Sequence, residues 1–353
     1  MVEFLDYFFA HLQDFKSGRL PLVDLRSPRE FALGAMPYAV NIPLFTDDER
    51  ATVGTTYKQI GKQEATQQGL EMVAQKVETF LDELMAAAGP GKRIAIHCWR
   101  GGMRSGSVAQ LLKAVGLSPI LLSGGYKVFR NQVLEQIDQI CEHPLLVLNG
   151  RTGSGKTECI RHLVANGSPA LDFEGIACHR GSAIGDINIV KPQPTQQNFE
   201  NQLAADYYPF KTVRRIIVEV EQDIGTIRMP PKLRHHILTS DMVLLERTME
   251  DRIAHLQREY VLNWNGKEDA QFQERMLHLK KHIQGPIYGQ ILEHVRLREF
   301  PEAIKLLLNH RYDKCYDKSI LRQINQFKDS IPMSMGLQAA CQRILNLAES
   351  ILT

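Results

Sequence analysis

Short apolar runs alternate with longer amphipathic stretches along the first part of the chain. The runs lie at residues 20–26, 39–44, 93–98 and 118–125. Each is bounded by Gly, Pro or charged residues, as buried β-strands commonly are. The stretches at 69–89 and 105–116 repeat their apolar residues with helical spacing. Alternating strands and helices of this kind predict a parallel sheet with flanking helices.

The same alternation starts again after a second helical stretch. Residues 127–143 have helical spacing that ends before Pro144, and a new strand-like run, LLVLNG, follows. We expect a helix at 156–166 after it and another strand in the segment PALDFEG, residues 169–175. Past Arg247 the pattern turns mainly helical. The chain is therefore predicted to contain two α/β parts, the second with a helical C-terminal subdomain.

We place the domain boundary near Glu142, which gives domains of 1–142 and 143–353. A chain of 353 residues with 44% hydrophobic and 23% charged residues has enough apolar content for two packed cores. No apolar run approaches the roughly 18 residues of a membrane span, and the N-terminus is acidic early. We expect a cytoplasmic protein without membrane contact.

Charge and cysteine content narrow the function further. The formal net charge is only +2, so nucleic acid would need a local basic patch. The six cysteines are scattered, with no C-x-x-C pair, which argues against a disulfide framework or a structural metal site. We expect no tightly bound cofactor.

Cys98 ends a predicted strand in HCWRGGMRS, and the following helix is expected to begin around Ser105. Gly101 and Gly102 let backbone N–H groups turn toward one point above the helix N-terminus, where negative charge is stabilised. A thiolate suits that position, because helix N-termini and arginines lower a cysteine pKa. The alternative is a buried structural cysteine. Two nearby arginines, Arg100 and Arg104, favour a catalytic thiol that handles a phosphate-like anion.

The first 130 residues or so resemble the rhodanese family. The resemblance is carried by LVDLRSPREFALGAMPYAVNIPL together with HCWRGGMRS, which stands where the persulfide cysteine of that family stands. One departure is that five residues separate Cys98 from Arg104, where ordinary rhodaneses have a shorter loop. The longer loop is similar to that of related phosphatases, and it implies a cradle wide enough for a tetrahedral phosphorus acid. The first domain is thus expected to be a rhodanese-like sheet.

The second domain opens with a phosphate loop, GRTGSGKT, between a predicted strand and a predicted helix. This matches the P-loop pattern G-x-x-x-x-G-K-[ST] in the context that confirms it, and it predicts a P-loop NTPase-like α/β domain. The phosphate-binding residues are expected to be Gly150, Arg151, Thr152, Gly153, Ser154, Gly155, Lys156 and Thr157. Lys156 supplies a point charge, and Thr157 is the ligand if magnesium binds. Asp172 and Glu174 are candidates to orient a metal or water, or are ordinary strand-end carboxylates.

The combination of both domains with FEGIACHRGS, QPTQQNFENQL and VEVEQDIGTIRMP closely resembles the tRNA 2-selenouridine synthase family. The resemblance covers nearly the whole chain. It implies a transferase that acts on tRNA with 2-thiouridine at the wobble position. The implied substrates are geranyl diphosphate, whose geranyl group goes to the sulfur, and selenophosphate, whose selenium replaces that sulfur. An enzyme that supplies selenophosphate is an expected partner.

This resemblance suggests a division of labour between the two sites. We hypothesise that the P-loop holds the diphosphate of geranyl diphosphate, with Lys156 stabilising the departing pyrophosphate. Cys98 would receive or guide selenium from selenophosphate held by Arg100 and Arg104. Selenophosphate or a nucleotide at the P-loop remains open, because the loop pattern specifies phosphates only.

Contact with RNA requires further residues, since a wobble base is read by splaying and stacking. The candidate RNA-binding residues are Trp99, Lys211, Arg214, Arg215, Arg228, Lys232 and Arg234. The nearby rings Tyr207, Tyr208 and Phe210 make this the best local mixture of cations and aromatics. An exposed helix over core aromatics explains the same pattern equally well. His179 and Arg180 belong to a family motif without an assigned role.

Three other functions fit parts of the sequence. A sulfurtransferase fused to an ATP-dependent small-molecule kinase would place ATP in the P-loop. A nucleotide-switched binding module would leave Cys98 unreactive. A protein phosphatase would use the long cysteine loop.

Overall fold

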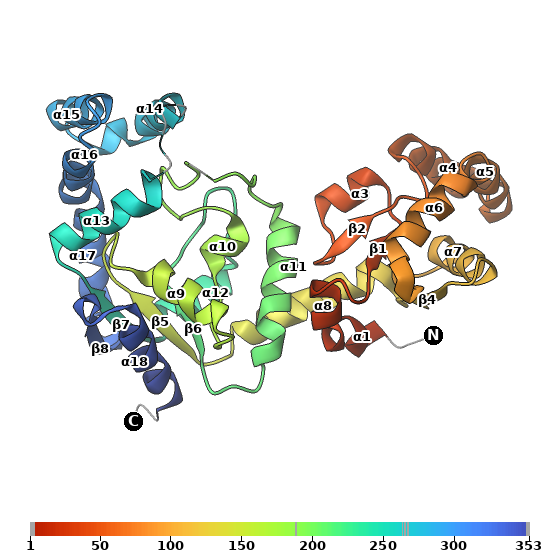
Figure 1. Ribbon diagram of the computed structural model, residues 1–353, viewed down its shortest axis with the longest axis horizontal. Helices are drawn as coiled ribbons and strands as arrows, with labels where there is room; N and C mark the ends of the chain where they lie inside the picture. The colour runs from red at the N-terminus through yellow and green to blue at the C-terminus, as the bar shows by residue number, and fades with distance from the viewer. Residues whose placement is uncertain (1–3, 188, 263, 265, 267, 351–353) are drawn as a thin grey trace. The chain divides into compact units, whose positions relative to one another are not determined.

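The computed structural model describes residues 4–187, 189–262, 264, 266 and 268–350, with the side chains of Phe4, Leu5 and Asp6 left aside. The chain forms two compact units (Figure 1). The first unit contains Met1–Ile137 and Thr195–Tyr208, and the second contains Asp138–Pro194 and Pro209–Thr353.

A parallel sheet organises the first unit, as predicted. Its strands are β1 (Leu22–Asp24), β2 (Ala39–Asn41), β3 (Arg93–His97) and β4 (Ser118–Leu121). They pair in the order β2-β1-β3-β4, and all three pairings are parallel. The carboxyl ends of β1 and β3 therefore lie side by side, with Asp24 opposite His97.

The helices of this unit are α1 (Phe4–Ala10), α2 (Leu12–Lys16), α3 (Pro28–Leu33), α4 (Asp47–Gln59), α5 (Lys62–Ala74), α6 (Val77–Ala88), α7 (Met103–Ala114), α8 (Gly125–Ile140) and α11 (Gln196–Tyr207). The helical stretch predicted at 69–89 is thus divided between α5 and α6. Its break lies at Gln75 and Lys76, which are outside both helices.

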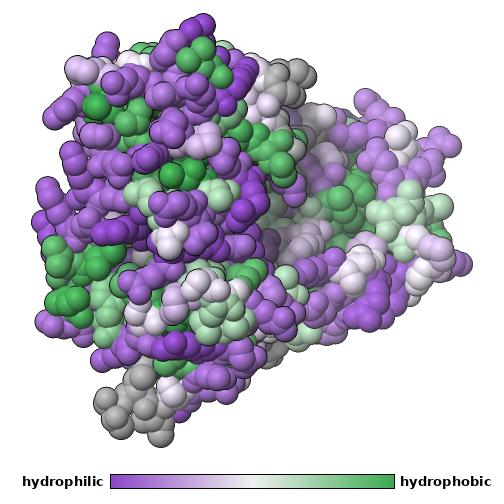
Figure 2. All heavy atoms as spheres, turned by 60° about the vertical axis from the view of Figure 1, so that its left-hand side comes forward, coloured by the Kyte–Doolittle hydropathy of each residue, from purple (hydrophilic) through white to green (hydrophobic). Residues whose placement is uncertain are grey.

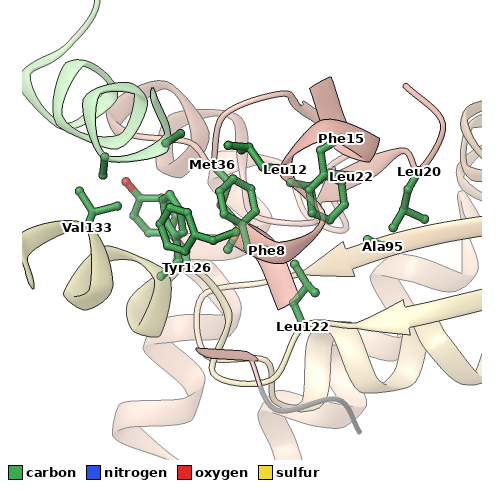
Figure 3. Packing of buried hydrophobic residues seen from close by; sticks show 14 of the residues in the cluster. Phe8, Leu12, Phe15, Leu20, Leu22, Met36, Ala95, Leu122, Tyr126 and Val133 are labelled. Atoms are coloured by element: carbon green, nitrogen blue, oxygen red, sulfur yellow. The ribbon is translucent and has the colours of Figure 1, made fainter. Parts of the chain in front are cut away.

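Alternate strand residues face opposite sides of this sheet. Leu22 and Ala95 belong to a core built with α1, α2 and α8, in which Phe8 and Tyr126 are buried (Figure 3). Val23 belongs to the other core, which is shared with α6 and α7. Because side chains alternate along a strand, this two-sided burial explains why β1 and β3 read as continuous apolar runs.

Helix α11 is far from the rest of its unit in the sequence. Asn198 accepts a hydrogen bond from the Ala35 N–H (2.7 Å), and the Asn201 amide donates to the Ala35 carbonyl (2.8 Å). Asn201 also donates to the Tyr126 hydroxyl (2.9 Å), and Ala204 lies in the core of the first unit. This long-range docking had no signal in the local sequence pattern.

The second unit is built on another four-stranded parallel sheet. Its strands are β5 (Leu145–Asn149), β6 (Ile216–Glu219), β7 (Asp241–Glu246) and β8 (Phe327–Pro332), in the order β6-β5-β7-β8. Of these, only β5 was predicted. One face packs on α9 (Lys156–Ala165) and α18 (Leu337–Glu349). Strand β5 lies between β6 and β7. Parallel sheets commonly bind ligands at the carboxyl end of a strand in this position.

The strand predicted in PALDFEG is wrong. Only Ala170 forms a bridge, to Ile217, and the chain then turns into α10 (Phe173–Ala177). Asp172 caps this helix by accepting a hydrogen bond from the Gly175 N–H (2.7 Å). Aspartate favours helix N-caps, and this preference overrides the short apolar run.

The remaining helices confirm a helical C-terminal part. They are α12 (Pro231–Thr239), α13 (Met249–Tyr260), α14 (Glu268–Leu279), α15 (Gly285–Arg296), α16 (Phe300–Leu307), the π-helix η4 (Leu308–Tyr312) and α17 (Asp313–Arg322). Short 3₁₀ turns are η1 (Gly89–Gly91), η2 (Tyr208–Phe210), η3 (Lys280–His282), η5 (Ile324–Gln326) and η6 (Met333–Met335). Within the described part of the chain, no helix is long and apolar enough to cross a membrane.

Candidate functional site: a thiol cradle and a phosphate loop

Cys98 directly follows β3, at the carboxyl edge of the first sheet. Helix α7 begins at Met103 with Gly102 as its N-cap, which is two residues before the predicted start. The Cys98 Sγ lies 3.2 Å from the Ser105 Oγ, and the cysteine is 3% exposed. The thiol is therefore held at the bottom of a short loop that leads into a helix N-terminus.

The surroundings of Cys98 favour its thiolate. Burial raises the pKa of this thiol, but the Ser105 hydroxyl and the Arg104 charge lower it more, together with the backbone N–H groups of Ser105 and Arg100. The resulting pKa is below the ordinary value for cysteine. A larger fraction of the side chain is thus ionised near neutral pH, and the thiolate is the nucleophile.

The two predicted arginines contribute in different ways. Arg104 is held by Glu30, with 3.1 Å between Nη1 and Oε2, so its guanidinium is positioned beside the loop. Arg100 has an exposed side chain, and its backbone N–H is the group directed at the thiolate. An incoming anion would thus meet an Arg104 guanidinium that Glu30 holds in place and an Arg100 side chain that is exposed to solvent.

Two glycines allow the cysteine loop to pack tightly on the segment after β4. A Cβ on Gly101, whose φ is +63°, would lie 2.7 Å from the Leu122 carbonyl oxygen. A Cβ on Gly125 would lie 2.2 Å from the Cys98 carbonyl oxygen. Both contacts are too short for any larger residue. The cysteine loop is therefore held in place by close packing on the segment after β4, as well as by the helix that follows it.

A buried polar network lies next to the cysteine loop, at the carboxyl ends of β1 and β3. Arg26 donates to Asp24 (2.6 Å from Nη2 to Oδ2), and the His97 Nε2 lies 3.7 Å from the same carboxylate oxygen. The Arg26 guanidinium sits 3.8 Å from the ring centre of Tyr126. Trp99, whose ring centre is 5.8 Å from that of Tyr126, is 38% exposed. Trp99 thus packs on one side and presents a ring to solvent beside the nucleophile.

The predicted phosphate loop follows β5 and leads into α9. Gly150 donates its N–H to the Asn149 side chain (2.7 Å). Gly153 and Gly155 have φ values of +81° and +99°, which only glycine adopts readily. The loop therefore has the wrapped backbone that phosphate binding needs.

Lys156 lies inside this loop. Its ammonium group donates to the Gly150 carbonyl (2.8 Å) and lies 5.1 Å from the ring centre of Tyr316. The residue is only 8% exposed. A phosphate that replaced the carbonyl as partner would meet a positive charge largely removed from water, where its attraction is strongest.

The other loop residues have separate contacts. Arg151 pairs with Asp317 (2.7 Å), and the Thr152 carbonyl accepts from Arg252 (2.8 Å). Ser154 is buried, and no described group is hydrogen-bonded to its hydroxyl. These contacts hold the loop from the side of α13 and α17.

Three carboxylates gather beside the phosphate loop. Glu174, Glu219 and Glu221 bring ligand atoms within 4.8 Å of one another. The Thr157 hydroxyl donates to Glu219 (2.8 Å). Burial, followed by the charge of a neighbouring carboxylate, raises the pKa of each to about 8. Hydroxyl and carboxylate oxygens are ligands that suit magnesium, so this group fits such an ion.

Sequence reasoning named Glu174 but missed Glu219 and Glu221. Both lie in VEVE at the carboxyl end of β6, where charged residues alternate with apolar ones. Acidic residues at the end of a buried parallel strand were the available signal. Asp172, the other candidate, caps α10 and is not part of the cluster.

Replacing Glu219 by glutamine is expected to stabilise the second unit at high pH. Its folded pKa of about 8 exceeds the unfolded value, so stability falls as pH rises from about 4.5 toward 8. At pH 9 we expect the free energy of unfolding of Glu219→Gln to exceed that of the wild type by about 1–3 kcal/mol, and little gain below pH 5.

Urea titrations with EDTA measure this difference. The two tryptophans separate the units, so Trp264 fluorescence in a Trp99→Phe background follows the second unit. The exposed Glu274 on α14 provides the control Glu274→Gln. A gain for Glu219→Gln that is equal at all pH values would contradict an elevated pKa.

Local acidic or carbonyl groups already pair with most of the candidate RNA-binding cations. Arg215 pairs with Asp241 (3.0 Å), Arg228 with Asp223 (2.5 Å) and Lys232 with Glu142 (3.0 Å). Arg214 donates to the Glu349 carbonyl (2.7 Å). Lys211 and Arg234 lie half-buried in the same unit. RNA binding by these residues stays a prediction, and exposed pairs can exchange partners at little cost.

The aromatic residues of that prediction lie mostly in packed positions. Tyr207 is 2% exposed, and Tyr208 stacks on Phe9 with ring centres 4.5 Å apart. Both belong to the first unit, while the cations belong to the second. In the motif after α10, His179 accepts from the Gly181 N–H (3.1 Å) and Arg180 lies over the Tyr260 ring.

Comparisons with known proteins agree with this architecture. Residues 10–132 match the rhodanese-like domain, and residues 143–346 match the tRNA 2-selenouridine synthase AAA domain. The fold and the two sites thus define a P-loop protein fused to a rhodanese-like domain. The chain belongs to the tRNA 2-selenouridine synthase family.

Relatives from three bacteria support this assignment. Proteins named tRNA 2-selenouridine synthase are 34% identical in Hydrogenovibrio crunogenus, over 84% of this chain and 88% of theirs, and 33% identical in Sulfurovum sp., over 89% and 93%. One from Nitrosomonas europaea is 39% identical over 69% of this chain. That match spans 64% of the Nitrosomonas protein, less than two thirds of its length.

Proposed function

We propose that this protein is a transferase that replaces sulfur by selenium in 2-thiouridine at the wobble position of tRNA, in the cytoplasm. The observation that carries this proposal is that one chain holds a cysteine of lowered pKa and a phosphate loop with a buried lysine. These sites suit a reaction with two different phosphorus-containing substrates. The names of the relatives support the same activity.

The first step is geranyl transfer at the phosphate loop. The thiocarbonyl sulfur attacks the carbon of geranyl diphosphate that carries the diphosphate. A C–S bond forms, the C–O bond breaks, and pyrophosphate leaves with the bonding electrons while the base loses its N3 proton. Lys156 stabilises the negative charge of the leaving group. Magnesium held by Thr157 and Glu219 would add positive charge at the same place.

The second step is selenium transfer at the cysteine loop. Selenophosphate binds with its phosphate against Arg104 and the N–H groups of the loop. The Cys98 thiolate attacks phosphorus, the P–Se bond breaks, and hydrogen selenide leaves. This selenide attacks the pyrimidine carbon and displaces geranyl thiolate, while water later releases phosphate from Cys98. Attack on phosphorus needs no change of its oxidation state and agrees with the long, phosphatase-like loop.

Geranylation makes the exchange feasible because it converts the thiocarbonyl sulfur into a thiolate leaving group. The two sites therefore act in sequence on the same base. Trp99 is the residue best placed to stack on that base near Cys98, since its ring is partly exposed. An enzyme that makes selenophosphate is the expected partner.

Mass spectrometry of tRNA nucleosides tests this function. Geranyl diphosphate alone should yield S-geranyl-2-thiouridine, and later addition of selenophosphate should yield 2-selenouridine. A requirement for ATP without geranylated nucleoside would instead support a kinase fused to a sulfurtransferase. Phosphate release from an aryl phosphate without any nucleoside change would support a phosphatase.

A further inference from the structure

An apolar cavity lies within the second unit, directly beside the phosphate loop. Helices α13, α14, α15 and α16 contribute to its wall, for example through Leu256, Phe272, Val295 and Ile304. None of the described residues that line it is an acid, lysine or arginine. On the face of the second unit seen in Figure 2, hydrophobic residues form small patches among hydrophilic ones.

The cavity and the phosphate loop share a wall. Thr152, the third residue of the loop, lines the cavity. Leu256 also lines it, and a Cβ on Gly153 would come within 3.1 Å of the Leu256 side chain. Arg252, one turn earlier on α13, donates to the Thr152 carbonyl (2.8 Å). A ligand with its phosphates in the loop thus has the cavity next to it.

The lining chemistry selects the type of ligand. Its polar residues include Ser182 and Tyr260, whose hydroxyls are hydrogen-bonded to each other (3.1 Å). A nucleotide base brings several ring nitrogens and amino groups, and among the described lining residues only a few hydroxyls, such as that of Tyr312, could partner them, so most would lose water without compensation. A hydrocarbon chain loses nothing there and gains the burial of its apolar surface.

We propose that this cavity holds the isoprenoid chain of the diphosphate donor whose phosphates bind at 150–157. The inference rests on the proposed function, because it assumes that the donor is an isoprenoid diphosphate. It adds where the chain lies and which residues recognise it. Ile304 and Ala303 on α16 line the cavity and face the isoprenoid chain, so they set the length of isoprenoid that the site accepts.

Calorimetric titration with pyrophosphate and with geranyl diphosphate tests the inference. The dissociation constant of pyrophosphate divided by that of geranyl diphosphate measures how much the isoprenoid chain adds to binding. We expect the wild type to bind geranyl diphosphate at least about tenfold more tightly than pyrophosphate. Ile304→Asn places an amide in the cavity and should lower this ratio about tenfold with pyrophosphate binding unchanged. Leu306, also half-buried on α16 but outside the cavity lining, gives the control Leu306→Asn, which should keep the ratio.

A second variant guards against a folding defect. Ala303 is 2% exposed, and Ala303→Leu should fill part of the cavity, weakening geranyl diphosphate several-fold while sparing dimethylallyl diphosphate. Equal binding of pyrophosphate and geranyl diphosphate by the wild type, or unchanged ratios in both variants, would overturn this inference and leave the proposed function intact. A wild type that binds neither ligand would overturn the proposed function as well.

Discussion

Lys156→Ala is expected to lower the rate of geranyl transfer at saturating geranyl diphosphate by about 10²–10³-fold. The lysine is almost fully buried, so its charge acts on a departing pyrophosphate through little water. Its removal also takes away the cation that favours the charged forms of all three carboxylates, Glu174, Glu219 and Glu221. Initial rates of S-geranyl-2-thiouridine formation measure the loss.

The same variant separates the two steps. Supplied with tRNA that is already geranylated, Lys156→Ala should still form 2-selenouridine, because selenium transfer uses the other unit. The exposed Lys305 on α16 provides the control Lys305→Ala, which should keep both activities. Unchanged geranyl transfer in Lys156→Ala at saturating donor would remove the phosphate loop from the reaction.

Local patterns predicted those parts of the fold that depend on neighbouring residues. The central strands β1 and β3 of the first unit are buried on both faces, which makes them continuous apolar runs. The phosphate loop needs glycines at fixed spacing, and Gly153 and Gly155 have the positive φ values that explain them. Each of these signals is contained within a few consecutive residues of the chain.

Contacts between distant segments were beyond those patterns. Helix α11 joins the first unit through Asn198 and Asn201, which both bind the backbone of Ala35, more than 160 residues away in the chain. A side-chain amide that binds a distant backbone group looks like any polar helix residue. The segment PALDFEG was misread for a related reason, since capping by Asp172 decided its structure.

The candidate site shows the same limit. Cys98 and Lys156 were predicted because each belongs to a compact motif. Glu219 and Glu221 reach Glu174 because the segment before α10 pairs with β6, through Ala170 and Ile217. The apolar cavity joins α13 through α16 to the loop, and its existence depends on how these helices pack.

Cys98→Ser is expected to abolish selenium transfer, with a loss of about 10³-fold or more, while geranyl transfer continues. A serine hydroxyl ionises far less readily than a thiol, so the hydrogen bond from Ser105 and the charge of Arg104 no longer produce an anionic nucleophile. The exposed Cys315 gives the control Cys315→Ser, which should keep both steps. Formation of 2-selenouridine by Cys98→Ser at the wild-type rate would exclude the thiol from the reaction.

Ser105→Ala tests whether ionisation of the Cys98 thiol controls the rate of selenium transfer. Loss of the hydroxyl 3.2 Å from the Cys98 sulfur removes the largest contribution that lowers this pKa, so the midpoint of the pH profile for alkylation by iodoacetamide should move upward. At pH 7 a smaller fraction is then thiolate, and selenium transfer should slow in proportion and recover as pH rises. A recovery that tracks the alkylation profile would tie the rate to ionisation of Cys98, whereas a uniform loss at all pH values would mean that Ser105 only shapes the loop.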